Sequence, residues 1–141
     1  MQLELSKYDD VETGGILLGD FKDDTLIIHE ATDAGYENVV REKAMFQYDH
    51  DYVSHVASIL SALYTPALFV AGVWHKHNRA SEGEPFSYAD ELMHKQLQHT
   101  DLQPAISVLF EKCEDDVYDM RVFLLDVSGN HKQIEPEIVN L

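Results

Sequence analysis

The chain has 141 residues, and its 10 basic against 26 acidic side chains give a net charge of −16. This length predicts a single domain, residues 1–141, with its own hydrophobic core, and the negative charge disfavours nucleic-acid binding because it repels phosphate backbones. The sequence has no long apolar stretch and no signal-peptide pattern, so we expect a cytoplasmic protein that binds no membrane.

The first predicted elements form a β-hairpin. Residues 15–20 and 25–30 have the composition of strands, and the Lys-Asp-Asp of residues 22–24 is typical of the turn between them. Glu12 comes shortly before the first strand, in the run Glu-Thr-Gly-Gly-Ile-Leu-Leu-Gly. A polar connector is expected to follow over residues 31–43.

A helix and a buried strand are predicted next. Asp49 is a suitable cap for a helix that extends to about residue 64, and Pro66 ends it. Residues 68–74, with the sequence Leu-Phe-Val-Ala-Gly-Val-Trp, are apolar at every position. Such a run predicts a strand in the middle of a sheet that is covered on both faces.

Two histidines end this strand. Residues i and i+2 of a strand point to the same face, so His75 and His77 are expected to project side by side while Lys76 points away. Zinc lies about 2.0–2.1 Å from an imidazole nitrogen, so the pair could grip one ion. Two surface histidines without a metal are the alternative interpretation.

Asp90 is the expected third ligand. It lies in a predicted helix over residues 87–99, at the edge of an apolar arc that would face the sheet. Three protein ligands leave the fourth tetrahedral position open, as in catalytic zinc sites. Ser87-x-x-Asp90 also matches the helix capping box, and both roles can hold together. The predicted arc contains Tyr88, Ala89, Leu92, Met93 and Leu97.

The remaining predicted elements are strands. Residues 105–109 and 117–127 form a further pair, and a weak strand is expected at residues 134–139. Strands mixed with two main helices, without regular alternation, predict an α/β (mixed α+β) fold in which a curved mixed sheet is flanked by helices.

Glu12 is a candidate proton carrier for the water that a metal would activate, although a solvated residue before a strand is the alternative. Other metalloprotein classes fit less well. Zinc deaminases need Pro-Cys-x-x-Cys, and the chain has only Cys113. A cupin would need a second motif that is missing, and 141 residues cannot build the eightfold barrel of amidohydrolases.

Together these residues resemble the JAMM metalloproteases, also called MPN or JAB-domain proteins. The pattern of that family is a Glu before a Gly-Gly-Ile-Leu-Leu-Gly-like strand, then His-x-His, then Ser-x-x-Asp. The resemblance implies that His75, His77 and Asp90 bind one Zn²⁺ per chain. It further implies that Glu12 is the general acid/base, that Ser87 steadies the oxyanion, and that the fold is the JAMM/MPN fold, which resembles the cytidine-deaminase-like architecture.

The small stand-alone bacterial and archaeal members remove ubiquitin-like proteins from targets or trim their precursors. The resemblance therefore implies a zinc metallopeptidase, a deubiquitinase-like isopeptidase that cuts after a C-terminal Gly-Gly. Its expected partners are a ubiquitin-like protein or its conjugate, together with activating and conjugating enzymes of the same pathway. A non-catalytic MPN-type scaffold and a zinc peptidase with another substrate stay open as alternatives, because the motif encodes a reaction and not a substrate.

The chain departs from the family pattern in two places that matter below. Family members often have Ser-Pro around the second histidine, whereas this chain has Lys76 and Asn78. Eleven residues precede Glu12, so the first helix of the family is expected to be shortened or missing.

Overall fold

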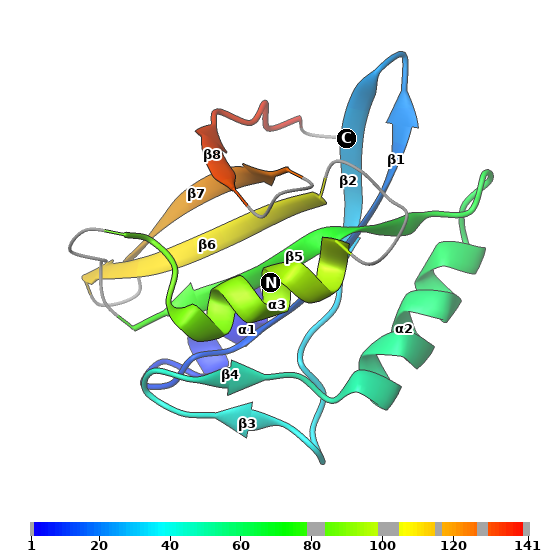
Figure 1. The fold of residues 1–141 in the computed structure, drawn as a ribbon. Coiled ribbons are helices and arrows are strands. Elements are labelled where there is room, and N and C mark those ends of the chain that lie inside the picture. The colour runs from blue at the N-terminus through cyan, green and yellow to red at the C-terminus, as the bar shows by residue number, and fades with distance from the viewer. Residues whose placement is uncertain (1, 79–83, 99–104, 115–116, 127–129, 140–141) are drawn as a thin grey trace.

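The computed structural model describes residues 2–78, 84–98, 105–114, 117–126 and 130–139 (Figure 1). No helix in these ranges is long and apolar enough to cross a lipid bilayer. The helices are α1 (Gln2–Lys7), α2 (His50–Ala62) and α3 (Tyr88–Gln98). The strands are β1 (Gly14–Lys22), β2 (Thr25–Ala31), β3 (Val40–Arg41), β4 (Phe46–Gln47), β5 (Phe69–His77), β6 (Ala105–Glu114), β7 (Val117–Leu125) and β8 (His131–Ile134).

One strongly twisted sheet forms the centre of the molecule, with the strand order β2-β1-β5-β6-β7-β8 (Figure 1). β5 and β6 run parallel, and the other neighbours in this sheet are antiparallel. β3 and β4 form a separate two-stranded ribbon. The predicted α/β class with a mixed sheet flanked by helices is therefore confirmed.

The predicted hairpin is present and longer than expected. Lys22 pairs with Thr25, so the turn consists of Asp23 and Asp24, with φ of 49° and 64°. Two successive left-handed residues suit the right-handed twist of a hairpin, and Asp tolerates this conformation better than most side chains. The expected connector is interrupted at residues 40–41, which pair with β4.

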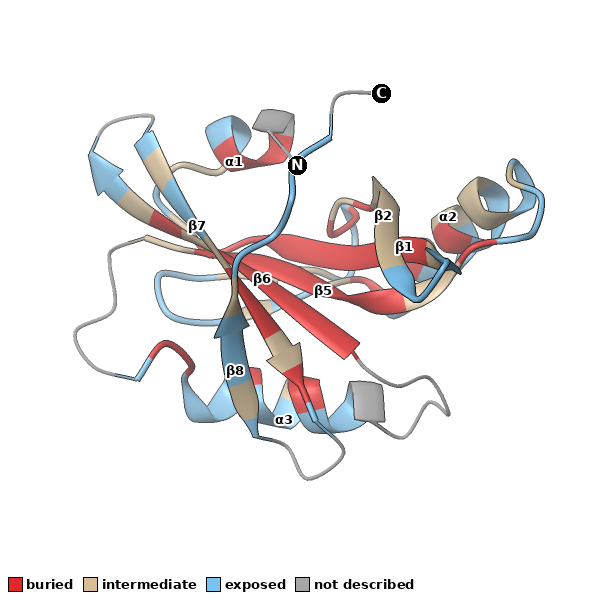
Figure 2. Cartoon of the chain, turned by 90° about the horizontal axis from the view of Figure 1, so that it is seen from above, coloured by how far each residue is buried: buried red, intermediate tan, exposed pale blue. Residues whose placement is uncertain are grey.

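β5 lies between β1 and β6 and is covered on both faces, as predicted. Val73 packs in an apolar cluster with Val53 of α2, and Met93 of α3 packs against the same cluster. Trp74 packs on the other face with Leu5 of α1. Figure 2 shows α1 and α3 on opposite sides of the sheet. The strand that carries the two histidines is thus held rigidly from both sides.

The N-terminal helix is short but present. α1 has six residues, and Leu5 buries its side chain in the cluster around Trp74. Thr13 and Arg41 also contact this helix through the carboxylate of Glu4. The chain therefore provides cover for this face of the sheet itself.

Most helices and strands begin or end a few residues away from their predicted boundaries. α2 begins at its predicted cap, since Oδ1 of Asp49 accepts a hydrogen bond from the backbone N–H of Tyr52 at 3.1 Å. α3 begins directly after Ser87, and residue 99, its predicted end, lies outside the described residues, as does residue 127.

The expected strand at residues 134–139 is wrong. The last strand, β8, is His131–Ile134, and residues 135–139 have no regular structure. Pro136 explains the difference, because proline has no N–H to donate to a ladder and ends strands. β6 in turn continues to Glu114, beyond its predicted end at residue 109, because β7 pairs along its length.

Candidate metal centre

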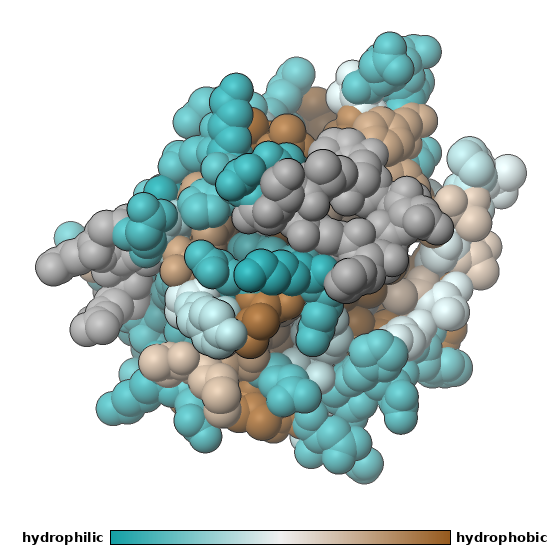
Figure 3. All heavy atoms as spheres, viewed as in Figure 1, coloured by the Kyte–Doolittle hydropathy of each residue, from teal (hydrophilic) through white to brown (hydrophobic). Residues whose placement is uncertain are grey.

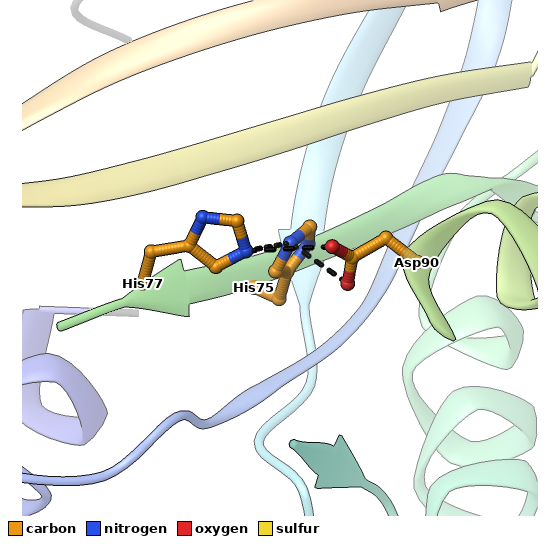
Figure 4. A group of neighbouring side chains, drawn as sticks. All are labelled: His75, His77 and Asp90. Carbon is orange, nitrogen blue, oxygen red and sulfur yellow. Dashed lines mark hydrogen bonds and ion pairs between the residues drawn. The ribbon is translucent and has the colours of Figure 1, made fainter. Parts of the chain in front are cut away.

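Three side chains converge at the carboxyl end of β5 (Figure 4). His75 and His77 project from the strand, and Asp90 reaches toward them from the first turn of α3. Nε2 of His75 lies 3.1 Å from Nε2 of His77 and 3.3 Å from Oδ1 of Asp90. Nε2 of His77 lies 3.5 Å from Oδ2 of Asp90. One ligand atom from each residue lies within 4.8 Å of the others, so this group could hold a metal ion.

The cap of α3 fixes the carboxylate of Asp90. Its Oδ2 accepts a hydrogen bond from the backbone N–H of Ser87 at 2.7 Å, and Oγ of Ser87 accepts one from the N–H of Asp90 at 3.3 Å. This reciprocal pair is the capping box that the sequence predicts. The same carboxylate faces both histidines, so its place in the cap is compatible with the ligand role expected for Asp90.

The electrostatics of the group favour a neutral His75 beside an ionised Asp90. Burial lowers the pKa of His75 to about 4, although the charge of Asp90 opposes the shift. Burial alone would raise the pKa of Asp90, but its hydrogen bond with His77 and the nearby His75 hold it well below its usual range. His75 is therefore neutral near pH 7 with a lone pair to offer, which metal binding requires.

The pKa of His77 is shifted in the opposite direction to that of His75. Burial would lower its pKa, but the hydrogen bond to Asp90 and the charges of Asp90 and Glu12 outweigh burial and raise it. A histidine in such a negative surrounding attracts a cation, either a proton or a metal ion.

Glu12 lies just before β1, near enough to His77 and Asp90 for their charges to act on its carboxyl group. Gly14 pairs with His75 across the β1–β5 ladder, and a Cβ at Gly14 would lie only 2.9 Å from Cβ of His75. Glycine therefore lets β1 approach the histidine strand closely. The backbone N–H of Glu12 donates to the carbonyl of Glu42 at 2.8 Å.

The carboxyl group of Glu12 is shielded from solvent. The residue is only 9% exposed, which rules out the alternative of a solvated residue. Burial raises the pKa of Glu12 to about 7, while the charge of His77 opposes the rise and that of Asp90 adds to it. A carboxyl group with this pKa can both accept and donate a proton at neutral pH.

The apolar arc predicted for α3 faces the sheet only in part. Met93 packs against the cluster around Val73 as predicted, Tyr88, Ala89 and Leu92 are exposed, and the side chain of Leu97 lies outside the described residues. Tyr88 and Leu92 are 74% and 43% exposed, whereas Asp90 and His94, one turn apart, are buried. Nε2 of His94 lies 3.0 Å from Oγ of Ser107 on β6. The helix thus faces the sheet with the polar side chains of Asp90 and His94 beside the apolar Met93.

The sequence does contain a signal for His94. It lies four residues after Asp90, and positions i and i+4 share a helix face, so both side chains are expected on the same side of α3. Ser107 has no comparable signal, because it lies within an otherwise apolar stretch of β6. Ser87 is exposed at the rim of the group. Its hydroxyl oxygen accepts from Asp90, which leaves the hydroxyl hydrogen for another acceptor.

Comparisons with known proteins bear on the fold of this chain but not on its function. No protein-family model matches the chain, and no curated protein matches it. Solved structures do match. One is the solution structure of protein DSY2949 from Desulfitobacterium hafniense, with a TM-score of 0.59 and 12% sequence identity over 96% of this chain and 83% of that chain. At this identity the likeness shows the fold alone.

Proposed function

We propose that this protein is a zinc-dependent peptidase of the JAMM/MPN type, which cuts after the C-terminal Gly-Gly of a ubiquitin-like protein in the cytoplasm. The observation that carries the proposal is the convergence of His75, His77 and Asp90 with a buried carboxyl group, Glu12, whose pKa is raised to about 7. The pairing of a three-ligand site with a proton carrier is the arrangement of metal-dependent hydrolases.

The donor set suits zinc. Two imidazole nitrogens and one carboxylate are ligands that zinc accepts in catalytic sites. A tetrahedral ion with bonds of about 2.0–2.1 Å holds its ligand atoms about 3.3–3.4 Å apart. The two imidazole nitrogens lie 3.1 Å apart, and each has a different oxygen of Asp90 at 3.3 or 3.5 Å, so the three residues are close enough to share one ion.

The side chains divide the remaining chemistry. Zinc, when bound, supplies the Lewis acidity that makes water a nucleophile at neutral pH. Glu12 takes the proton of the attacking water and passes it to the leaving amine. The hydroxyl of Ser87 donates to the oxygen on which negative charge develops. Asp90 and the helix cap hold that hydroxyl beside the group.

The ribbon of β3 and β4 favours an extended substrate. It is a separate two-stranded ribbon, and Glu42 between its strands bonds to the backbone of Glu12. An extended peptide can add to such an edge through main-chain hydrogen bonds. Glycines at the scissile end, lacking Cβ, would let that backbone come close to the site.

The test uses a ubiquitin-like protein with a C-terminal extension, compared with a version in which Ala-Ala replaces Gly-Gly. We expect cleavage of the first and little of the second. Glu12→Gln should keep the metal and the fold but lose about 10²–10⁴-fold in kcat, since it removes the proton acceptor. Glu37→Gln, at an exposed position, is the matched control and should keep full activity.

Each alternative makes a different forecast. Equal cleavage of both substrates, or cleavage only of short unrelated peptides, would favour a general zinc peptidase. Binding of the modifier without any cleavage, unchanged by Glu12→Gln, would favour a non-catalytic scaffold. Activating and conjugating enzymes are proposed partners only if the protein also cleaves conjugates of the modifier. Cleavage of extended precursors alone would not require them.

A further inference from the structure

The strand end that carries the two histidines has a second row of polar side chains on its opposite face. Lys76 and Asn78 alternate with the histidines and therefore point away from the metal group. Lys76 is 0% exposed. Both positions are those at which the chain departs from the Ser-Pro common in JAMM proteins, so their contacts belong to this chain.

These two side chains bind the backbone between α1 and β1. Nζ of Lys76 donates to the carbonyls of Tyr8 and Asp9, the latter at 3.0 Å. Nδ2 of Asn78 donates to the carbonyl of Asp10 at 3.2 Å and to that of Lys43, next to Glu42, at 3.1 Å. Three successive carbonyls are thus held by Lys76 of β5 and by Asn78, the residue that directly follows the strand.

The same strand holds the chain again immediately after Glu12. The backbone N–H of Lys76 donates to the carbonyl of Thr13 at 2.8 Å. Glu12 therefore lies between two attachments that both lead to Lys76, one through its side chain and one through its main chain. Lys76 itself lies between His75 and His77. A shift of its side chain would therefore change the position of Glu12 relative to these two histidines.

A buried ammonium group is costly unless its donors are satisfied. The environment of Lys76 meets this need with backbone carbonyls, and Nζ also lies 5.6 Å from the ring centre of Tyr118. The side chain of Asp9 is gripped separately, by Nζ of Lys112 at 2.7 Å and the hydroxyl of Tyr118 at 3.0 Å. An apolar side chain in place of Lys76 would leave the carbonyls of Tyr8 and Asp9 without this donor.

We propose that Lys76 and Asn78 are positioning residues that fix residues 8–10 and thereby aim the carboxyl group of Glu12 at the metal group. The inference rests on the proposed function for its effect on catalysis, but its structural part does not. The end of β5 then serves both halves of the site: His75 and His77 offer ligands, and Lys76 and the adjoining Asn78 place the proton carrier. A displacement of about 1 Å at a reacting group can cost about 10²-fold in rate.

The experiment compares Lys76→Met, which keeps the apolar stem, and Asn78→Ala, which removes an amide at the partly exposed strand end. Lys132→Met, at an exposed position of β8, is the matched control. Hydrogen exchange of the Glu12 amide, bound metal per chain, kcat and KM are measured for each. We expect exchange at Glu12 to be about 10-fold faster in both test variants, with metal content unchanged. We expect kcat to fall about 10–10²-fold at similar KM.

Wild-type exchange at Glu12 in both variants would overturn the inference, as would faster exchange with unchanged kcat. Loss of metal in parallel with kcat would also overturn it, because the effect would then lie at the ligands. Lys76→Met can fail to fold, and Asn78→Ala then decides alone. If the wild-type protein cleaves nothing, the proposed function fails, whereas exchange at Glu12 still decides whether these side chains hold the segment.

Discussion

Asp90 contributes to two structures at once, the cap of α3 and the candidate metal centre. Its Oδ2 lies 2.7 Å from the backbone nitrogen of Ser87 and 3.5 Å from Nε2 of His77. The helix therefore cannot form its capping box without presenting the carboxylate to the histidines. A residue shared in this way couples the local folding of α3 to the geometry of the site.

The first prediction follows from this sharing. Asp90→Ala should lose bound zinc, because two remaining ligands hold the ion poorly. Elemental analysis of purified protein should give about one zinc per chain in the wild type and far less in the variant. Glu91→Ala, an exposed neighbour in the same turn, should keep its zinc. Equal metal in wild type and Asp90→Ala would remove Asp90 from the ligand set.

Ser87 gives a prediction with two separable parts. Loss of its Oγ removes the acceptor for the Asp90 N–H, so Ser87→Ala should cost about 1 kcal/mol of unfolding free energy as a lost cap. Loss of the hydroxyl donor should lower kcat by about 10–10³-fold. Ser87→Asp offers a cap without a neutral donor, and it should restore stability but not activity. Urea denaturation and steady-state kinetics measure the two parts independently.

At the scale of elements, the docking of α3 depends on a buried polar contact. His94 is 4% exposed and faces Ser107 of β6. Burial lowers the pKa of His94 to about 4, against an ordinary value of 6.5. Below about pH 6.5 the unfolded chain binds a proton at this position that the folded protein does not accept until about pH 4. The folded state therefore has its full stability above this window and loses stability as the pH falls through it.

This sign gives a third prediction. At 1.36 kcal/mol per pKa unit, His94 should cost the metal-free protein up to about 3 kcal/mol of unfolding free energy between pH 6.5 and pH 4. His94→Gln keeps a polar partner for Ser107 and removes the titration, so its stability should fall less over the same range. Denaturation curves at several pH values measure the difference. Parallel curves for the two proteins would show that His94 is not held neutral.

The sequence predicts those elements whose apolar pattern has one interpretation. The seven apolar residues before His75 predict a central strand, and β5 is one. The pattern of α3 misleads, because an amphipathic arc assumes that a helix is oriented by its apolar residues alone. Here Asp90 and His94 face the sheet together with Met93, and Tyr88 is left exposed. Docking through polar contacts cannot be read from hydropathy.

The site itself is predicted only in part for a related reason. Alternation along a strand is local, so it correctly separates His75 and His77 from Lys76. What Lys76 contacts depends on where residues 8–10 pass, which is a matter of tertiary structure. The same holds for Ser107, whose partner lies on another element. Local periodicity therefore identifies which side chains share a face, but not what lies opposite that face.

At the scale of the whole molecule, the dominant feature is charge. The net charge is −16, and hydrophilic side chains cover much of the face seen in Figure 3, with separate hydrophobic groups between them. Such a field attracts a basic partner from a distance and raises the rate of encounter, whereas it does little for the reaction once the complex has formed.

The last prediction separates encounter from chemistry. With a basic ubiquitin-like substrate, kcat/KM should fall about 10-fold or more as ionic strength rises from about 0.01 M to about 1 M, because the Debye length shrinks from about 30 Å to about 3 Å. The value of kcat should change little, since Glu12, His75 and Asp90 are buried and buried charges are screened far less than exposed ones. An uncharged peptide with the same Gly-Gly end provides the control, and its kcat/KM should be insensitive to salt. A flat salt response with the basic substrate would mean that the acidic surface plays no part in capture. An equal fall in kcat would place the effect of salt at the site itself.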